Sequence, residues 1–482
     1  MRLGTSSRDT QVCGIVSLPE ETVVRRVRNC LGRPDFEDFR AARKETADGS
    51  GGADGVRSLA GASGSGSAGS ADGARSSDGA DGSDSAGSAD GVRSLAGADG
   101  SGSASGAASI VVEISLSPAD FVTETVRYDR QPPVDPRAAA MSDDELLHMA
   151  MGAFNPKGGV LSVVGNAGSS VAGSAGETAH VPGVRPYVMA DGPAGLRIAE
   201  NYFEDAKGVH SMLPPMPLSL LPFATGPLKW ALKIMTPRPG RGTEVRHQYC
   251  TAIPIGTAIA QSWSTEFAEL CGDIVGEEME RFGVDLWLAP ALNIHRSIRC
   301  GRNFEYYSED PLLSGKMAAG VTRGVQRHPG RAVTIKHFAA NNQEFNRTSS
   351  NSLVSERAMR EIYLRGFEIC VKESAPRAVM SSYNLINGVH ASERRDLLED
   401  ILRAEFGFRG FVMTDWVIDG GMIPKDARYR SPVCALVAAA GNDVYMPGSR
   451  EDFARLTKEF GEGQVTRRQL EINATRVLRC MD

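Results

Sequence analysis

The sequence predicts an α/β protein, and three observations lead to that prediction. Short apolar runs recur after residue 136, each run ends in polar or aromatic residues, and the intervals between the runs are long enough for a helix. Strands that alternate with helices form parallel sheets, and residues 136–482 have the length of a (β/α)8 barrel of the TIM type with insertions. Seven runs qualify as candidate strands: 187–189, 253–260, 284–290, 333–335, 378–380, 411–416 and 443–448.

Helix signals occupy the intervals between these runs. Ser142 and Glu145 fit the capping-box pattern and apolar residues follow them, so a helix is predicted to begin there. Ser355 and Thr466 are N-cap candidates for two further helices. Another helix is predicted from four apolar residues that share one helical face: Phe267, Leu270, Cys271 and Ile274.

Two stretches of the barrel region are expected to be irregular. Residues 213–235 contain five prolines, which we expect to form an insertion without a regular helix. Residues 165–173 are rich in glycine but lack the lysine and the spacing of phosphate-binding loops, so we expect a loop at the barrel rim.

The first part of the chain has a different character. Residues 1–46 and 109–130 contain β-type segments, among them 12–18, 21–27 and 110–116. Between them, residues 47–108 are nearly all Gly, Ser, Ala and Asp, and this composition cannot bury enough apolar surface to offset its chain entropy. The sequence therefore predicts a small β module over 1–135, interrupted by a disordered low-complexity insertion at 47–108, ahead of a barrel domain over 136–482.

Composition limits the classes of partner. The net charge of -6 over 482 residues, with scattered lysines and arginines, argues against a nucleic-acid surface. The eight cysteines are widely spaced and form no zinc-binding pattern, so we expect reduced thiols and no metal. No apolar run suits a signal peptide or a membrane span, so we expect a cytoplasmic protein with no membrane partner.

Polar and aromatic residues gather at the predicted carboxyl ends of the strands, where barrels carry their chemistry. Carboxylates and cations beside an indole suit a neutral, polyhydroxylated ligand, because the charged groups bind hydroxyls and the indole covers the C–H face of a ring. No cofactor-binding motif accompanies them. The residues are Asp191, Arg302, Lys336, His337, Tyr383, Asp415 and Trp416.

Asp415 is a candidate nucleophile, because it ends the apolar run 411–416 next to Trp416. The alternative is an Asp that caps the following helix or turn. Each of the other residues also has a structural alternative, such as pairing of Arg302 with Glu305.

Six motifs resemble those of the glycoside hydrolase family 3 β-glucosidases, in the family's order. They are MADGPAGLR at 189–197, LAPALNIHR at 288–296, CGRNFEYYSEDP at 300–311, IKHFAANNQE at 335–344, MSSYNLINGVH at 380–390 and VMTDW at 412–416. The hexosaminidase branch of the family has a KHxPGHG loop, whereas this chain has KHFAANNQE, which is similar to the glucosidase branch.

The resemblance implies a retaining, exo-acting β-glycosidase that hydrolyses O-glycosyl bonds of a small glycoside or oligosaccharide through a covalent glycosyl-Asp415 intermediate. It also implies which residues hold the sugar. Those expected to bind its hydroxyls are Asp191, Arg197, Arg302, Lys336 and His337, and those expected to line the pocket are Met380, Tyr383 and Trp416.

Residues 1–135 resemble the fibronectin-III-like module that accompanies these barrels in the subgroup with inverted domain order. That resemblance also implies an α/β domain that supplies the general acid/base, which we do not recognise in this sequence, so we expect a chain truncated at its N-terminus. Three alternatives stay open: a sugar-binding but impaired barrel, a barrel complemented by another chain or within a homo-oligomer, and a Schiff-base aldolase that uses Lys336.

Overall fold

The computed structural model describes residues 132–154, 170–206, 208–213, 225–419 and 428–480, together with the backbone of five short strands within 21–127. The chain divides into two compact units. One is Val23–Thr125, and the other comprises Met1–Thr22 with Val126–Asp482.

The smaller unit contains β structure at two of the three predicted positions. Strand pairing follows the orders β1-β5 and β2-β4-β3. The predicted strand at 12–18 and nearly all of the predicted insertion at 47–108 lie outside the described residues, so the disorder of that insertion stays a prediction. The strands are β1 (Glu21–Val27), β2 (Ala42–Lys44), β3 (Arg57–Ser58), β4 (Val111–Glu113) and β5 (Phe121–Arg127).

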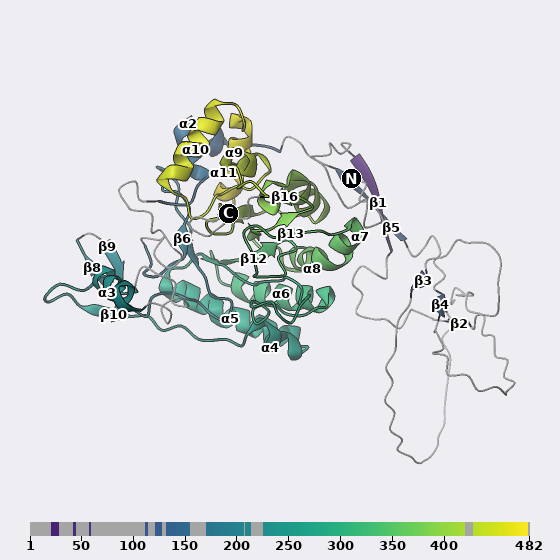
Figure 1. Ribbon diagram of the computed structural model, residues 1–482, viewed down its shortest axis with the longest axis horizontal. Helices are drawn as coiled ribbons and strands as arrows, with labels where there is room; N and C mark the ends of the chain where they lie inside the picture. The colour runs from purple at the N-terminus through teal and green to yellow at the C-terminus, as the bar shows by residue number, and fades with distance from the viewer. Residues whose placement is uncertain are drawn as a thin grey trace, which may run out of the picture. The chain divides into compact units, whose positions relative to one another are not determined.

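The larger unit is a barrel-like α/β structure around one mixed sheet (Figure 1). The strand order is β17-β14-β12-β11-β7-β6, in which all neighbours are parallel except β6, which runs antiparallel to β7. These strands are β6 (Gly176–Glu177), β7 (Val188–Ala190), β11 (Leu286–Trp287), β12 (Ala332–Phe338), β14 (Ala378–Ser381) and β17 (Phe411–Thr414).

Single β-bridges close this sheet into a ring of eight segments. Met413 of β17 pairs in parallel with Val444, the next residue Tyr445 pairs in parallel with Met151, and Gly152 pairs antiparallel with Thr178, which directly follows β6. The prediction of a barrel is therefore confirmed in outline. The expectation of eight parallel strands is wrong in one respect, because the segment at 176–178 runs in the opposite direction.

Two local predictions in the barrel region are wrong. The run 253–260 is not a strand; its second half belongs to helix α4 (Gly256–Gln261), which buries Ile259 and Ala260. A short apolar run cannot distinguish a buried helical face from a strand. The stretch 213–235 does contain a helix, α3 (Gly226–Met235), because Pro227 stands in its first turn, where a missing N–H costs no hydrogen bond.

The other helix predictions are confirmed, with one correction to a buried face. Ser142 and Glu145 form the predicted capping box of α2, and Thr466 caps α11. In α5, Cys271 is buried, but Phe267 and Leu270 face outward. The helices are α1 (Pro136–Ala139), α2 (Asp143–Met149), α5 (Thr265–Phe282), α6 (Pro311–Gln326), α7 (Glu356–Ala358), α8 (Arg365–Ser374), α9 (Cys434–Ala439), α10 (Arg450–Gly461) and α11 (Arg467–Leu478).

The helices lie around the sheet in groups. Helices α5 and α6 lie on one side of the sheet, and α2 gathers with α9, α10 and α11 on another (Figure 1). No helix among the described residues is long and apolar enough to span a membrane. The remaining strands are β8 (Asn201–Asp205), β9 (Gly208–Ser211), β10 (Val245–His247), β13 (Asn351–Ser352), β15 (Leu385–Ile386) and β16 (Val389–His390). The remaining helices are the π-helices η5 (Met359–Tyr363) and η7 (Asp396–Glu405) and the 3-10 helix η6 (Ala391–Glu393).

Close packing of α5 on α6 fixes the outer layer against the sheet. A Cβ atom on Gly272 would lie 2.1 Å from the carbonyl oxygen of Val321, and one on Gly324 would lie 2.0 Å from that of Glu269. Glycine therefore permits backbone contact that larger residues would prevent. All seven residues of β12 are buried, which holds the end of this strand in place below the site described next.

Candidate active site

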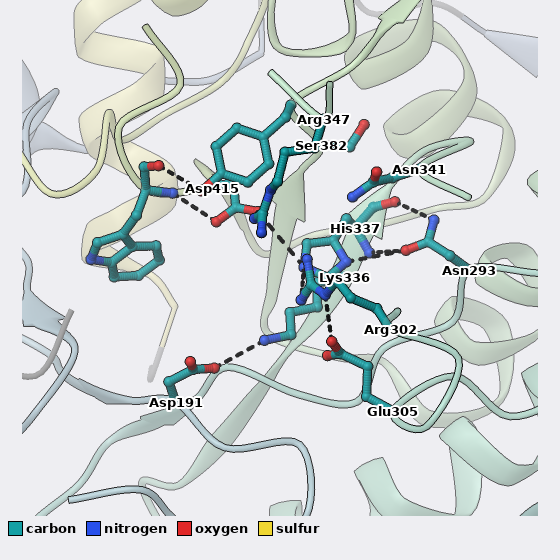
Figure 2. Close-up of polar contacts among 12 residues, drawn as sticks. Asp191, Asn293, Arg302, Glu305, Lys336, His337, Asn341, Arg347, Ser382 and Asp415 are labelled. Carbon is teal, nitrogen blue, oxygen red and sulfur yellow. Dashed lines mark hydrogen bonds and ion pairs between the residues drawn. The ribbon is translucent and has the colours of Figure 1, made fainter. Parts of the chain in front are cut away.

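The predicted site residues meet in one cavity of about 310 Å³ at the carboxyl ends of the strands (Figure 2). Asp191 follows β7, Lys336 and His337 lie near the end of β12, and Asp415 follows β17. The structure thus brings together all nine residues expected from the sequence: Asp191, Arg197, Arg302, Lys336, His337, Met380, Tyr383, Asp415 and Trp416. The cavity is also lined by Pro193, Leu288, Phe304, Glu305, Glu344 and Arg347.

Asp191 is held between two cations. Lys336 Nζ donates to Asp191 Oδ1 at 3.0 Å, and the Arg197 guanidinium pairs with Asp191 Oδ2. Burial raises the pKa of the Asp191 carboxyl, but Lys336 and Arg197 outweigh that effect and hold the pKa well below its usual range. This carboxylate therefore stays ionised and can accept hydrogen bonds from ligand hydroxyls.

Asp415 has one oxygen anchored and one that faces other pocket groups. Oδ1 accepts the backbone N–H of Trp416 at 2.7 Å. Oδ2 lies 3.7 Å from His337 Nε2 and 3.8 Å from an Arg347 nitrogen, and it has no hydrogen-bond partner among the described residues. No helix begins at Asp415 among the described residues, but a turn over 416–419 follows it, and Oδ1 accepts the first N–H of that turn, so the structural alternative accounts for Oδ1 and not for Oδ2. The arrangement is suited to a nucleophile.

Both ring nitrogens of the buried His337 side chain have polar neighbours. Asn293 Oδ1 lies 2.9 Å from the His337 backbone nitrogen and 3.1 Å from Nδ1, and an Arg302 nitrogen lies 2.8 Å from Nε2 (Figure 2). Burial, together with the nearby charges of Arg302 and Lys336, lowers the pKa of His337 well below its ordinary value. The imidazole is therefore neutral at physiological pH.

An aromatic wall stands beside Asp415. Trp416 Nε1 donates to the carbonyl oxygen of Ala175 at 2.9 Å, and Tyr383 Oη donates to the carbonyl oxygen of Trp416 at 2.6 Å. Burial and the charge of Asp415 raise the pKa of Tyr383 well above its ordinary value, so the phenol remains a donor. The indole is thereby fixed in orientation, as a stacking surface for a sugar ring requires.

Arg347 and Glu344 are pocket residues that the motif analysis did not assign to the site. The Arg347 guanidinium lies 4.3 Å from the centroid of the Tyr383 ring and donates to Glu344 Oε2 at 3.1 Å. Both residues belong to the polar loop after β12, which we recognised only as far as the motif ending at Glu344. The available signal was a second cation, eleven positions beyond Lys336, in the same polar loop.

Most charged groups of the cavity are paired with one another. Arg302 Nε pairs with Glu305 Oε1, as the structural alternative for these residues anticipated. Within the described residues, no group of three or more His, Cys, Asp or Glu side chains is arranged so that it could hold a metal ion.

Comparison with known proteins settles the family. The model described as "Glycosyl hydrolase family 3 N terminal domain" matches residues 227–480, which is more than half of the 482 residues. The chain belongs to glycosyl hydrolase family 3. The resemblance predicted from the six motifs is therefore confirmed.

Among relatives of this family-3 chain, β-glucosidase A of Butyrivibrio fibrisolvens is 52% identical over 166 residues, which are 34% of this chain and 20% of that protein. A β-glucosidase of Rhizobium radiobacter is 40% identical over 240 residues, which are 50% of this chain and 28% of that protein. An exo-α-(1->6)-L-arabinopyranosidase of Bifidobacterium breve is 45% identical over 169 residues, which are 35% of this chain and 22% of that protein.

Solved structures show the same relationship. The structure of β-glucosidase 3B from Thermotoga neapolitana in complex with α-D-glucose matches 71% of this chain and 42% of its own, with 38% sequence identity and a TM-score of 0.57. This chain thus spans between a fifth and three tenths of the length of the curated relatives described above.

Proposed function

We propose that this family-3 chain acts as a retaining, exo-acting β-glycosidase of β-glucosidase type, with Asp415 as its nucleophile. The observation that carries the proposal is the position of Asp415 Oδ2, which has no hydrogen-bond partner among the described residues and lies in a cavity of hydroxyl-binding groups. Further support comes from relatives named β-glucosidases and from a neighbour solved with glucose.

In the proposed reaction, Asp415 Oδ2 attacks the anomeric carbon and the bond from that carbon to the aglycone oxygen breaks. The leaving oxygen takes a proton from a general acid, and water later cleaves the glycosyl ester to release the sugar and regenerate the carboxylate. Asp191, Lys336 and Arg302 would hold ring hydroxyls, and Trp416 would cover one face of the ring.

Apart from Asp415, every carboxyl group that lines the described pocket has a cationic partner, so none stands out as the general acid. Each carboxylate other than Asp415 that lines the cavity is paired with a cation: Asp191 with Lys336 and Arg197, Glu305 with Arg302, and Glu344 with Arg347. Each of these carboxylates is thus already engaged by a cation, so none of them offers an unengaged group to a leaving oxygen. We propose that the acid comes from outside the described pocket, from a domain of another chain or of another copy.

Covalent trapping tests the nucleophile. A fluorinated glycoside with an activated leaving group should label Asp415 in the wild-type chain, and Asp415→Asn should abolish labelling because an amide oxygen is not anionic. Asp191→Asn should weaken binding of the reagent but retain labelling, because it removes hydrogen bonds rather than the attacking atom. Persistent labelling of the Asp415→Asn protein would place the nucleophile elsewhere.

Two other functions are separated by the same approach. A sugar-binding barrel without activity would bind glucose but show no labelled Asp415 in the wild type. An aldolase would form an imine between Lys336 and a carbonyl substrate that borohydride traps; Lys336 Nζ already donates to Asp191, which favours the role of a hydroxyl-binding group. Trapping of Lys336 by borohydride would favour the aldolase.

We also propose that residues 1–135 form a fibronectin-III-like module and that 47–108 is a disordered insertion, in a cytoplasmic protein whose widely spaced cysteines are reduced. Deletion of 47–108 should leave the melting temperature unchanged, because long flexible loops cost little to close. A drop of more than a few degrees would instead mean that the pairing of β3 with β4 contributes to stability.

A further inference from the structure

Asn293 contacts His337 through both ends of its amide. Its Oδ1 lies 2.9 Å from the backbone nitrogen of His337, and its Nδ2 lies 2.9 Å from the backbone oxygen of the same residue. A backbone N–H can only donate and a backbone C=O can only accept. The orientation of the Asn293 amide therefore follows from the backbone, without a choice between flipped alternatives.

This orientation fixes the tautomer of the His337 ring. Asn293 Oδ1, an acceptor, also lies 3.1 Å from His337 Nδ1, so Nδ1 must carry the proton. On the other side of the ring, an Arg302 nitrogen lies 2.8 Å from Nε2, and arginine can only donate. Two independent contacts thus require the same state, in which Nδ1 is protonated and Nε2 is an unprotonated acceptor.

The tautomer affects the two pocket groups next to Nε2. Asp415 Oδ2 lies 3.7 Å from Nε2, close enough for an Nε2–H to turn toward it and donate a hydrogen bond that would weaken Oδ2 as a nucleophile. With Nε2 unprotonated, no such donor exists. Arg302 uses Nε for Glu305 and one terminal nitrogen for His337, and its other terminal nitrogen is left without a hydrogen-bond partner among the described residues.

We propose that Asn293 is a positioning residue that holds His337 in the Nδ1–H tautomer, which keeps Asp415 free of a histidine donor and leaves one Arg302 nitrogen available to a sugar hydroxyl. The consequence for catalysis rests on the proposed function; the tautomer itself does not. Asn293 is buried and does not line the cavity, so it acts through His337 rather than by touching the substrate.

The structure also offers a matched control. Asn342 is a second buried asparagine, and its Nδ2 donates to the carbonyl oxygen of Ile294 at 2.7 Å, next to Asn293 in the same loop. Asn342 has no hydrogen bond to His337 among the described contacts. Asn342→Ala therefore removes a buried amide that supports the loop without removing the contact that sets the tautomer.

The first experiment reads the tautomer without any sugar. The protein is labelled with ¹⁵N at its eight histidines, and the His337 ring signals are assigned by their loss in His337→Gln. At pH 7 the wild type and Asn342→Ala should show an Nδ1–H, neutral ring. Asn293→Ala should shift part of the ring population away from Nδ1–H, because only the Arg302 contact then opposes the Nε2–H tautomer. Asn293→Asp should shift the ring toward imidazolium, because a carboxylate beside Nδ1 favours the charged form. An Nε2–H ring in the wild type, or an unchanged ring in Asn293→Ala, would overturn the proposal.

The second experiment follows the rate of Asp415 labelling by the fluorinated glycoside. Asn293→Ala should slow labelling at saturating reagent by about tenfold or more, and Asn342→Ala by less than about threefold. In Asn293→Asp the acid limb of the pH profile should move to higher pH. An equal loss of labelling rate in both alanine variants would mean that Asn293 only supports the loop and does not position His337. If wild-type Asp415 is never labelled, the proposed function fails while the spectra still decide the tautomer.

Discussion

Lys336 Nζ donates to Asp191 Oδ1 at 3.0 Å and so joins the carboxyl ends of β12 and β7, two strands separated in the sheet by β11. The lysine side chain is only 4% exposed, and the aspartate side chain 19% exposed. Removal of one partner from an ion pair this buried lowers the free energy of unfolding, because the remaining charge loses its partner in a site where water cannot fully replace it. The link therefore contributes to the shape of the pocket as well as to its charge.

Lys336→Met should lower the free energy of unfolding by about 2–3 kcal/mol, somewhat less than for a fully buried pair because Arg197 still contacts Asp191. The loss can be measured by urea unfolding at neutral pH. Lys316→Met is the matched control, since Lys316 pairs with Glu373 at 2.7 Å where both side chains are about one third exposed. That surface pair should contribute less than about 1 kcal/mol. Equal losses of unfolding free energy in the two variants would show that the pocket pair stabilises the fold no more than the surface pair does.

The neutral state of His337 should make stability depend on pH. Its folded pKa lies below the value of about 6.5 for an exposed histidine, so the unfolded chain binds a proton that the folded chain does not. Stability from this group is complete above about pH 6.5 and falls as the pH drops toward the folded pKa, by up to about 1.4 kcal/mol per pH unit. His337→Gln should remove that slope. Parallel pH curves of unfolding free energy for the wild type and the variant would contradict this assignment.

Arg347→Lys should impair the pocket although it conserves the charge. The planar guanidinium stacks on Tyr383 while it donates to Glu344 and approaches Asp415, and a lysine ammonium cannot reproduce that combination. We expect about a tenfold loss in the second-order rate of Asp415 labelling. Arg357→Lys, on α7 at an exposed pair with Glu361 of η5, is the control and should have no effect. A rate within about twofold of the wild type for Arg347→Lys would mean that the guanidinium is dispensable.

Leaving-group dependence should show whether this chain supplies a general acid. General acid/base assistance is worth about 10² to 10⁴-fold, and the described pocket carboxylates are committed to cations. The purified 482-residue chain should therefore glycosylate Asp415 with a dinitrophenyl glucoside, show a burst, and turn over cellobiose very slowly. Azide should speed the steady state, since an anionic nucleophile needs no base. Rapid cellobiose hydrolysis without an azide effect would show that this chain contains an effective acid.

The sequence predicted which side chains gather in the cavity better than it predicted the strands around them, and the roles of those side chains stay predictions. Asp191, Lys336 and Asp415 were accessible to sequence analysis because each follows a short apolar run, and the parallel strands bring the ends of such runs together. Asn293 lies inside the motif at 288–296, but its role was not accessible from the sequence, because it depends on a contact with His337 across 44 positions. Arg347 was missed for a similar reason: its stacking partner Tyr383 belongs to another strand end.

Backbone direction was equally inaccessible. A two-residue segment such as β6 has too few side chains to show periodicity, and nothing in Gly176 or Glu177 indicates whether the pairing with β7 is parallel or antiparallel. The prediction of a strand at 253–260 was wrong because the apolar spacing of this run suits both a strand and a short helix.

The reversed segment β6 also determines which surface loops can vary without effect on the pocket. In a strand that runs with its neighbours, the loop after the strand faces the chemistry; in β6 it is the loop before it, and residues 170–175 supply the carbonyl of Ala175 that holds the Trp416 indole. Residues 179–186 follow β6 and emerge at the opposite end of the barrel, where Arg185 pairs with Asp285. Insertions or fusion partners placed at the exposed residues Pro182 and Gly183 should thus leave the pocket unchanged, whereas substitutions at 170–175 should alter the wall that Trp416 forms.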